Sequence, residues 1–180
     1  MKSINDYADI VGHETIEEIR TLGSHLNGKI IQNINSTPIG GGVAEILNRM
    51  IPLLKEVGVD ARWDFIKGGE RFFEVTKKMH NSLHGVEENI TESDFKHFLD
   101  VTDENLKEMN LYGDIMFIHD PQPIGLIKIK NDGKHKDVKF IWRCHIDISS
   151  ANSKTFNFLK KFIEKYDYSV FSSPPLCPKT

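Results

Sequence analysis

The feature that most constrains the fold is a run of three glycines, residues 40–42, between two apolar segments of different periodicity. Residues 29–35 hold three isoleucines and predict a short strand. Residues 43–57 repeat apolar side chains at helical spacing, although Pro52 should kink that helix. Glycine has no Cβ, so this loop can take positive φ and approach a ligand closely, while the following helix directs its unpaired N–H groups at the loop. The unit therefore predicts a site for a phosphate or a sugar hydroxyl.

The glycine run leaves an alternative open, because a tight turn without any ligand has the same composition. It differs from the dinucleotide fingerprint G-x-G-x-x-G, and no Gly-Lys-Ser/Thr follows it as in a nucleotide-hydrolase phosphate loop. The run alone therefore indicates a place for chemistry without naming the ligand.

The rest of the chain alternates strand and helix patterns, and most of the strand patterns are continuous apolar runs. Such runs are typical of a parallel sheet that is covered on both faces. We therefore predict an α/β, Rossmann-like domain over residues 1–172, with a mostly parallel sheet, helices on both faces and a proline-rich tail over 173–180. The helices are expected over 5–26, 43–57, 70–83, 91–109 and 153–164, and the strands over 29–35, 59–66, 113–119, 138–145 and 168–171.

Composition excludes several classes of protein. The net charge of −3 argues against a nucleic-acid surface, which needs a basic excess. No apolar run approaches the roughly 20 residues that span a bilayer. The N-terminus lacks a signal-peptide pattern, and two cysteines cannot make a disulfide scaffold or a cysteine zinc site. A cytoplasmic domain without nucleic-acid or membrane partners is therefore expected.

Polar residues follow the expected strands at the edge of a parallel sheet where ligands bind. His119 and Asp120 follow one strand, and His145 ends the next. Asp120 can accept hydrogen bonds from sugar hydroxyls, or it can cap a following helix that has Pro121 in its first position. Two histidines on neighbouring strand ends beside a glycine loop favour a site over two unrelated structural histidines.

A third polar group lies on the helix expected over 70–83. His80 and His84 are four residues apart and have the spacing of zinc ligands, but the sequence offers no evident third ligand, so a solvated helix face is the simpler interpretation. Trp63 and Trp142 are expected in the core or in a cleft wall, where an indole can also stack on a sugar ring.

Taken together, these segments resemble one family. The motifs that carry the resemblance occur in order along nearly the whole chain: Asn-Ser-Thr-x-x-Gly-Gly-Gly-Val-Ala-Glu-Ile-Leu at 35–47, Gly-Val-Asp-Ala-Arg-Trp at 58–63, Phe-Phe-Glu-Val-Thr-Lys-Lys-x-His-Asn at 72–81, His-Asp-Pro-Gln-Pro at 119–123 and Trp-Arg-Cys-His-Ile-Asp at 142–147. They are similar to the N-terminal half of the trehalose synthases and related trehalose phosphorylases, which belong to glycosyltransferase family four and have the GT-B fold.

The resemblance implies a retaining transfer of glucose from a nucleoside diphosphate glucose to glucose, giving trehalose, with no metal and no cofactor. By this likeness Gly41 and Gly42 contact the donor phosphates, Asp120 contacts acceptor hydroxyls, and His145 stabilises the transferred glucose through its backbone carbonyl. The further acceptor-side candidates are Gln122, Lys78, His80 and Asn81.

The family's second, nucleotide-binding domain has no counterpart in the 180 residues, and the tail over 173–180 lies where the crossover to it is expected. Since stabilisation of the leaving group is usually the largest catalytic term, little transfer activity is expected from this chain alone. Either a separate C-terminal chain then supplies the missing half or the sequence is a truncated product, and self-association through the exposed cleft is a further expectation. The alternatives are a non-catalytic sugar-binding or interaction module and, less favoured, a nucleotide-binding domain of another class.

Overall fold

The computed structural model describes residues 3–172, and the proline-rich tail predicted over 173–180 lies outside them. A five-stranded, wholly parallel sheet has the order β2-β1-β3-β4-β5. Its strands are β1 (Ile30–Asn35), β2 (Asp60–Phe65), β3 (Ile115–His119), β4 (Lys139–Arg143) and β5 (Tyr168–Val170). The predicted fold class is confirmed, and the strand order reverses between β1 and β3, where a parallel α/β sheet opens a crevice at its carboxyl edge.

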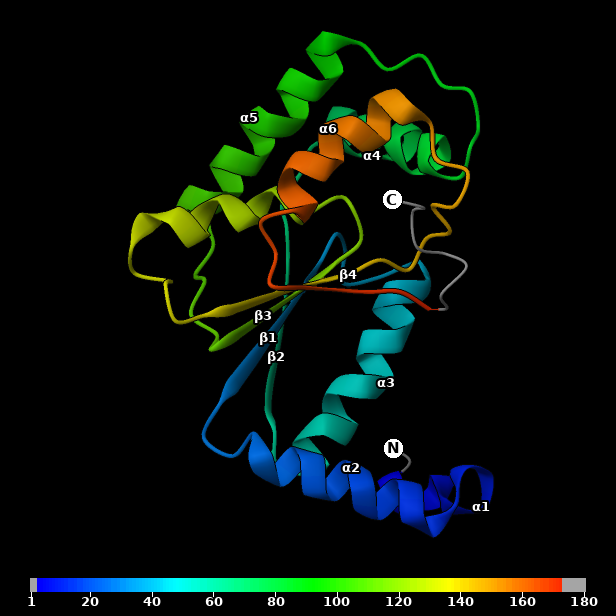
Figure 1. Ribbon diagram of the computed structural model, residues 1–180, viewed down its shortest axis with the longest axis vertical. Coiled ribbons are helices and arrows are strands. Elements are labelled where there is room, and N and C mark those ends of the chain that lie inside the picture. Colours follow the sequence, from blue (N-terminus) through cyan, green and yellow to red (C-terminus); the bar gives the residue numbers. More distant parts are fainter. Residues whose placement is uncertain (1–2, 173–180) are drawn as a thin grey trace.

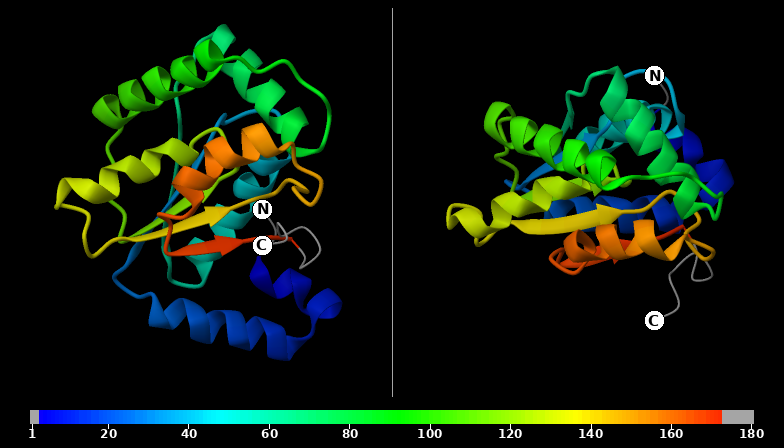
Figure 2. Two further views of the ribbon diagram at one scale, coloured as in Figure 1. Left: turned by 45° about the horizontal axis from the view of Figure 1, so that its top comes forward. Right: turned by 90° about the horizontal axis from the view of Figure 1, so that it is seen from above.

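Helices cover both faces of the sheet (Figure 1). One layer holds η1 (Ile4–Tyr7), α1 (Ala8–Val11), α2 (His13–His25) and α3 (Gly42–Glu56), and the other holds α4 (Glu70–Leu83), α5 (Glu92–Glu108), η2 (Ile124–Asp132) and α6 (Ser153–Ile163). Figure 2, left, shows α2 and α5 on opposite sides of the sheet. None of the helices within 3–172 is both long enough and apolar enough to cross a membrane.

Two separate apolar cores result from the alternation of side chains along each strand. Ile34 of β1 packs into the larger core beneath α4, α5 and α6, whereas Ile31, an odd number of positions earlier on the same strand, packs beside the smaller core under α2 and α3. Trp142 is fully buried in the larger core, and Trp63 is half-buried beside the smaller one.

Two parts of the predicted element map are wrong. The helix expected over 5–26 is divided, because Gly12 has φ 87° and ψ 150°, a conformation that ends α1 and starts α2 in a new direction. Residues 124–132 form the 3-10 helix η2, which buries Ile124, Leu126 and Ile127. No helical periodicity predicts it because the 3-10 repeat is close to three residues rather than 3.6.

Other local predictions hold. Helix α5 begins near the expected position 91 with a capping box, in which Thr91 accepts a hydrogen bond from the Asp94 N–H and the Asp94 side chain accepts one from the Thr91 N–H. Helix α3 runs through Pro52 to Glu56.

Candidate functional site

A cavity of about 420 Å³ opens at the carboxyl edge of the sheet, between the ends of β3 and β4 and the start of α3. This volume lies in the range of small-molecule sites. We call it the strand-end cavity, and its lining residues are Gly42, Val43, Ile46, His80, His84, Asp120, Arg143, His145, Ile146 and Ser172. Four residues that the sequence singles out, Gly42, His80, Asp120 and His145, therefore share one hollow.

The glycine loop enters this cavity from the end of β1. The Asn35 side chain holds the loop, since its amide donates to the Thr37 carbonyl at 2.8 Å and its oxygen accepts from the Trp63 indole at 2.9 Å. Gly40 has φ 75° and Gly41 has φ 92° with ψ 150°, a region that is essentially restricted to glycine. Helix α3 then begins at Gly42 and directs its first N–H groups toward the loop.

Gly42 differs from the two glycines before it. Its φ is ordinary, and a Cβ added to it would meet no atom within 4 Å. Neither backbone strain nor packing within residues 3–172 therefore requires a glycine there. A side chain at this position would instead occupy space in the strand-end cavity, which Gly42 lines.

Asp120 is anchored at three of its atoms. Its N–H donates to the Arg143 carbonyl at 2.8 Å, its carbonyl accepts from the Trp142 indole at 3.0 Å, and its Oδ1 accepts from the His145 N–H at 2.8 Å. The alternative in which Asp120 caps a helix starting at Pro121 is wrong, because η2 starts three residues after Pro121 and the carboxylate turns to His145.

The conformation and charge of Asp120 are both unusual. Its φ is 64°, a left-handed conformation that aspartate tolerates better than most residues. Burial raises the pKa of its carboxyl to about 6, although the His145 N–H and the nearby Arg143 charge act in the opposite direction. With Oδ1 engaged, Oδ2 has no hydrogen-bond partner among residues 3–172 and is the oxygen open to a ligand.

His145 is held by its main chain and by its ring. Its Nε2 lies 3.0 Å from His119 Nδ1, and His119 Nε2 lies 3.1 Å from Asn33 Oδ1. Burial, the neighbouring His145 and the Arg143 charge together lower the pKa of His119 to about 3, and burial and the Arg143 charge lower that of His145 to about 4. Both rings are therefore neutral at pH 7.

Arg143 brings a permanent positive charge to the cavity, and three of its five N–H donors are engaged within the described chain. Nη1 donates to the carbonyls of Cys144 and Val170 at 3.1 and 3.2 Å, and Nη2 donates to the Ser172 hydroxyl at 2.9 Å. The guanidinium therefore fastens the end of β4 to the end of β5 and to Ser172 beyond it.

His80 and His84 also line the cavity, from the last turn of α4 and the residue just beyond it. Their ring centroids lie 5.0 Å apart. Burial lowers the pKa of His80, and the neighbouring His84 lowers it further. Both rings add polar groups to a cavity whose apolar lining residues are Val43, Ile46 and Ile146.

The sequence that forms this site is similar to known sequences. Residues 33–178 match the family described as "Trehalose synthase, N-terminal domain". The chain belongs to this family. It is 43% identical to the trehalose synthase of Thermococcus litoralis over 94% of the chain and 36% identical to that of Rubrobacter xylanophilus over 98%. The trehalose phosphorylase of Grifola frondosa is a more distant relative, at 30% identity over 96% of the chain.

The chain spans only part of these relatives: 41% of the Thermococcus trehalose synthase, 43% of the Rubrobacter one and 26% of the Grifola trehalose phosphorylase. The family match begins at Asn33 and therefore includes the glycine loop, Asp120 and His145. The strand-end cavity thus lies entirely within the region that defines the trehalose synthase N-terminal domain.

The other residues suggested by the family resemblance do not line this cavity. Gly41 directly precedes the lining residue Gly42, Lys78 is exposed, and the Asn81 amide donates to Glu88 at 2.7 Å. Gln122 is half-buried, and its Oε1 is a buried acceptor without a partner in the described chain. Their roles stay predictions.

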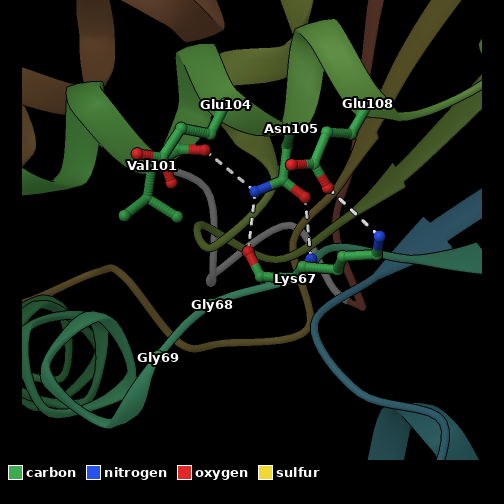
Figure 3. A pocket seen from close by; sticks show the side chains of 7 residues that line it. All are labelled: Lys67, Gly68, Gly69, Val101, Glu104, Asn105 and Glu108. Atoms are coloured by element: carbon green, nitrogen blue, oxygen red, sulfur yellow. Dashed lines mark hydrogen bonds and ion pairs between the residues drawn. The ribbon is translucent and has the colours of Figure 1, made fainter.

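A second hollow, of about 280 Å³, lies at the same edge of the sheet, where the chain leaves β2 (Figure 3). The Asn105 side chain of α5 crosses it, accepting from the Lys67 N–H and donating to the Lys67 carbonyl, both at 2.7 Å, and donating to the Val101 carbonyl at 2.9 Å. Lys67 also pairs with Glu108 at 3.1 Å (Figure 3). We call this arrangement the Lys67–Asn105 clamp.

The sequence analysis did not identify Asn33 and Asn105 as residues with a role at this edge of the sheet. Asn33 lies within the apolar run of β1 and is 1% exposed, so a buried amide in a central strand was the available signal, since such a group needs partners. Asn105 lies on the buried face of an amphipathic helix and is 4% exposed, but its partner in a loop 38 residues earlier is not a local pattern.

Proposed function

We propose that this chain is the acceptor side of a retaining glucosyltransferase that moves glucose from a nucleoside diphosphate glucose to glucose and so forms trehalose. The observation that carries the proposal is the strand-end cavity, where Gly42, Asp120 and His145 meet. The relatives that bear the name trehalose synthase supply the substrate class.

In this proposal the Asp120 carboxylate accepts hydroxyl hydrogens of the acceptor glucose through Oδ2. The anchoring of its other three polar atoms keeps the carboxylate in one orientation, which lowers the entropy cost of binding. A charge-assisted hydrogen bond of this kind contributes about 1.5–3 kcal/mol. Trehalose, which contains the same ring, would compete for the same place.

The start of α3 would receive the donor phosphates. Its first N–H groups and the positive end of its dipole favour an anion, and Gly41 and Gly42 leave room for close approach. His145 would lie beside the transferred glucose and stabilise its developing positive charge through the backbone carbonyl, since its own N–H is occupied by Asp120.

Transfer needs more cationic groups than the cavity offers. Arg143 is the one Arg or Lys among the residues that line the cavity, and three of its five N–H groups already bond to Cys144, Val170 and Ser172. We therefore propose that the leaving diphosphate is neutralised by a nucleotide-binding domain on another segment or chain, and that residues 1–180 alone transfer glucose slowly or not at all. Metal and cofactor have no part in this proposal, and a cytoplasmic location remains a prediction.

Calorimetric titration of the 180-residue chain tests the proposal. We expect heat on addition of glucose and of trehalose, and none on addition of UDP-glucose or ADP-glucose. Asp120→Asn is the matched variant, because it keeps the size of the side chain and an acceptor for the His145 N–H. A response to neither sugar would contradict the proposal and favour an interaction module, and tight binding of NAD would favour the third alternative.

A further inference from the structure

Three polar side chains from three neighbouring strands form one hydrogen-bonded row that ends in the strand-end cavity. Asn33 of β1 contacts His119 at the end of β3 at 3.1 Å, and His119 contacts His145, after β4, at 3.0 Å. Asn33 and His119 are each 1% exposed, so water does not compete for these bonds. His145 lines the cavity.

The donor and acceptor of each hydrogen bond in this row can be assigned. The Asn33 Nδ2 donates to the Arg62 carbonyl at 3.2 Å, which leaves Oδ1 facing His119 Nε2. An amide oxygen only accepts, so His119 Nε2 carries the proton. A neutral imidazole has a single N–H, so His119 Nδ1 accepts, and the proton between the two rings belongs to His145 Nε2.

Both rings must be neutral for this reasoning to hold at pH 7. Burial and the Arg143 charge lower the pKa of His119 to about 3 and that of His145 to about 4. Protonation of His119 would also remove the lone pair that receives the His145 proton. The geometry and the burial therefore favour the same protonation state.

We propose that Asn33 and His119 are positioning residues that fix His145 as its Nε2–H tautomer, so that the lone pair on Nδ1 is the group this ring offers to a ligand. The part that concerns a sugar rests on the proposed function: Nδ1 then accepts a hydrogen bond from a hydroxyl. The Asp120 bond to the His145 N–H holds the main chain of the same residue, so ring and backbone are both constrained.

The test is a long-range ¹H–¹⁵N spectrum of histidine side chains in the ¹⁵N-labelled 180-residue chain at pH 7, joined to a trehalose titration. We expect His119 and His145 to be protonated at Nε2 and not at Nδ1. His135 is an internal reference: although burial lowers its pKa, Asp132 and the Leu111 carbonyl raise it above the ordinary value, and both its nitrogens face acceptors.

Three variants distinguish positioning from mere support. His119→Phe removes the acceptor, and we expect His145 to become a mixture of both tautomers. Affinity for trehalose, which contains the transferred ring that the proposed function places beside His145, should fall threefold or more. His119→Asn places an amide oxygen near the position of Nδ1, and we expect it to restore the Nε2–H form. Ser82→Ala removes a different buried hydrogen bond, to Thr155, and is expected to leave the His145 signals unchanged.

Each outcome decides one claim. Wild-type His145 protonated at Nδ1, or an unchanged tautomer in His119→Phe, would overturn the positioning role. A wild-type chain that shows the expected tautomers but gives no heat with glucose or trehalose would support the positioning role and overturn the proposed function. A His119→Phe chain that changes tautomer yet binds trehalose normally would overturn the contact between Nδ1 and a hydroxyl.

Discussion

Two hollows at the same edge of one sheet differ in how they treat their polar groups. In the Lys67–Asn105 clamp, the Asn105 amide is bonded on both sides within the chain, to Lys67 and to Val101. In the strand-end cavity, Asp120 keeps Oδ2 without a partner in the described residues, and Gly42 borders empty space. Since burying a polar group without a partner costs free energy, the first arrangement serves the fold and the second is suited to a ligand.

The largest expected effect is a loss of folding stability at acid pH, which originates in the strand-end cavity and not in the Lys67–Asn105 clamp. The two neutral histidines of the cavity have pKa values of about 3 and 4 in the fold, against about 6.5 in the unfolded chain, so the unfolded state binds more protons between these values and stability falls as pH falls. Asp120, with a pKa of about 6, acts in the opposite direction between pH 6 and 3.8. One pKa unit corresponds to about 1.36 kcal/mol, so the net loss from pH 7 to pH 4 is on the order of 4 kcal/mol.

Urea unfolding at pH 7, 5 and 4 measures this effect. His119→Asn is the matched variant, because it removes the buried imidazole with the lowest pKa and should flatten the profile. A stability that rises toward pH 4 would mean that Asp120 outweighs the histidine pair.

Breaking the clamp is expected to produce the next largest effect. Asn105→Leu fits an apolar side chain of similar size but leaves the Lys67 N–H and carbonyl without partners. We expect the free energy of unfolding to fall by about 3 kcal/mol, from about 1–3 kcal/mol for each group. Denaturant unfolding measures the loss, and glucose affinity should be unchanged in the folded protein.

Glu108→Gln is the control for the clamp, because it removes only the exposed ion pair with Lys67. An exposed pair contributes at most about 1 kcal/mol. If Glu108→Gln cost as much as Asn105→Leu, the importance of the amide would be contradicted.

Asp120→Asn is expected to weaken glucose binding without lowering stability, which is the reverse of the expectation for Asn105→Leu. The amide keeps an acceptor for the His145 N–H and tolerates positive φ, while it removes a buried charge, so stability at pH 7 should not fall. Loss of a charge-assisted bond of about 1.5–3 kcal/mol should weaken glucose binding by roughly 10- to 150-fold in calorimetry. A destabilised variant that binds glucose normally would place Asp120 with the structural residues.

The smallest expected effect is the difference in stability between alanine substitutions at two adjacent glycines. Gly41→Ala forces an alanine into φ 92° and ψ 150° and should cost about 1–3 kcal/mol of stability. Gly42→Ala meets no neighbouring atom and should leave thermal unfolding unchanged or slightly improved, since alanine favours a helix. Equal losses in both would show that Gly42 also serves the fold.

Much of the architecture could be predicted from local patterns. Continuous apolar strands alternating with amphipathic helices indicated a covered parallel sheet. The glycine run and the residues after each strand indicated the edge of the sheet at which the strand-end cavity lies. Gly12 and η2 were missed, because the first is one positive φ within a helical pattern and the second lacks the 3.6-residue period.

The site was only partly predictable. Gly42, His80, Asp120 and His145 share the strand-end cavity, but Lys78 and Asn81, although close to His80 in sequence, do not line it. Neighbouring positions on α4 point in different directions, so a motif read as one unit divides between the cavity and other surfaces.

Sequence alone determined the order of strands and helices, the glycine loop and the presence of polar residues at strand ends, because each depends on spacing within a short segment. The tertiary structure decided which of those residues meet: it joined Asn33, His119 and His145 across three strands and closed Asn105 onto Lys67. These contacts depend on strand order and register, which bring together residues 26 to 86 positions apart, and no local pattern encodes that pairing.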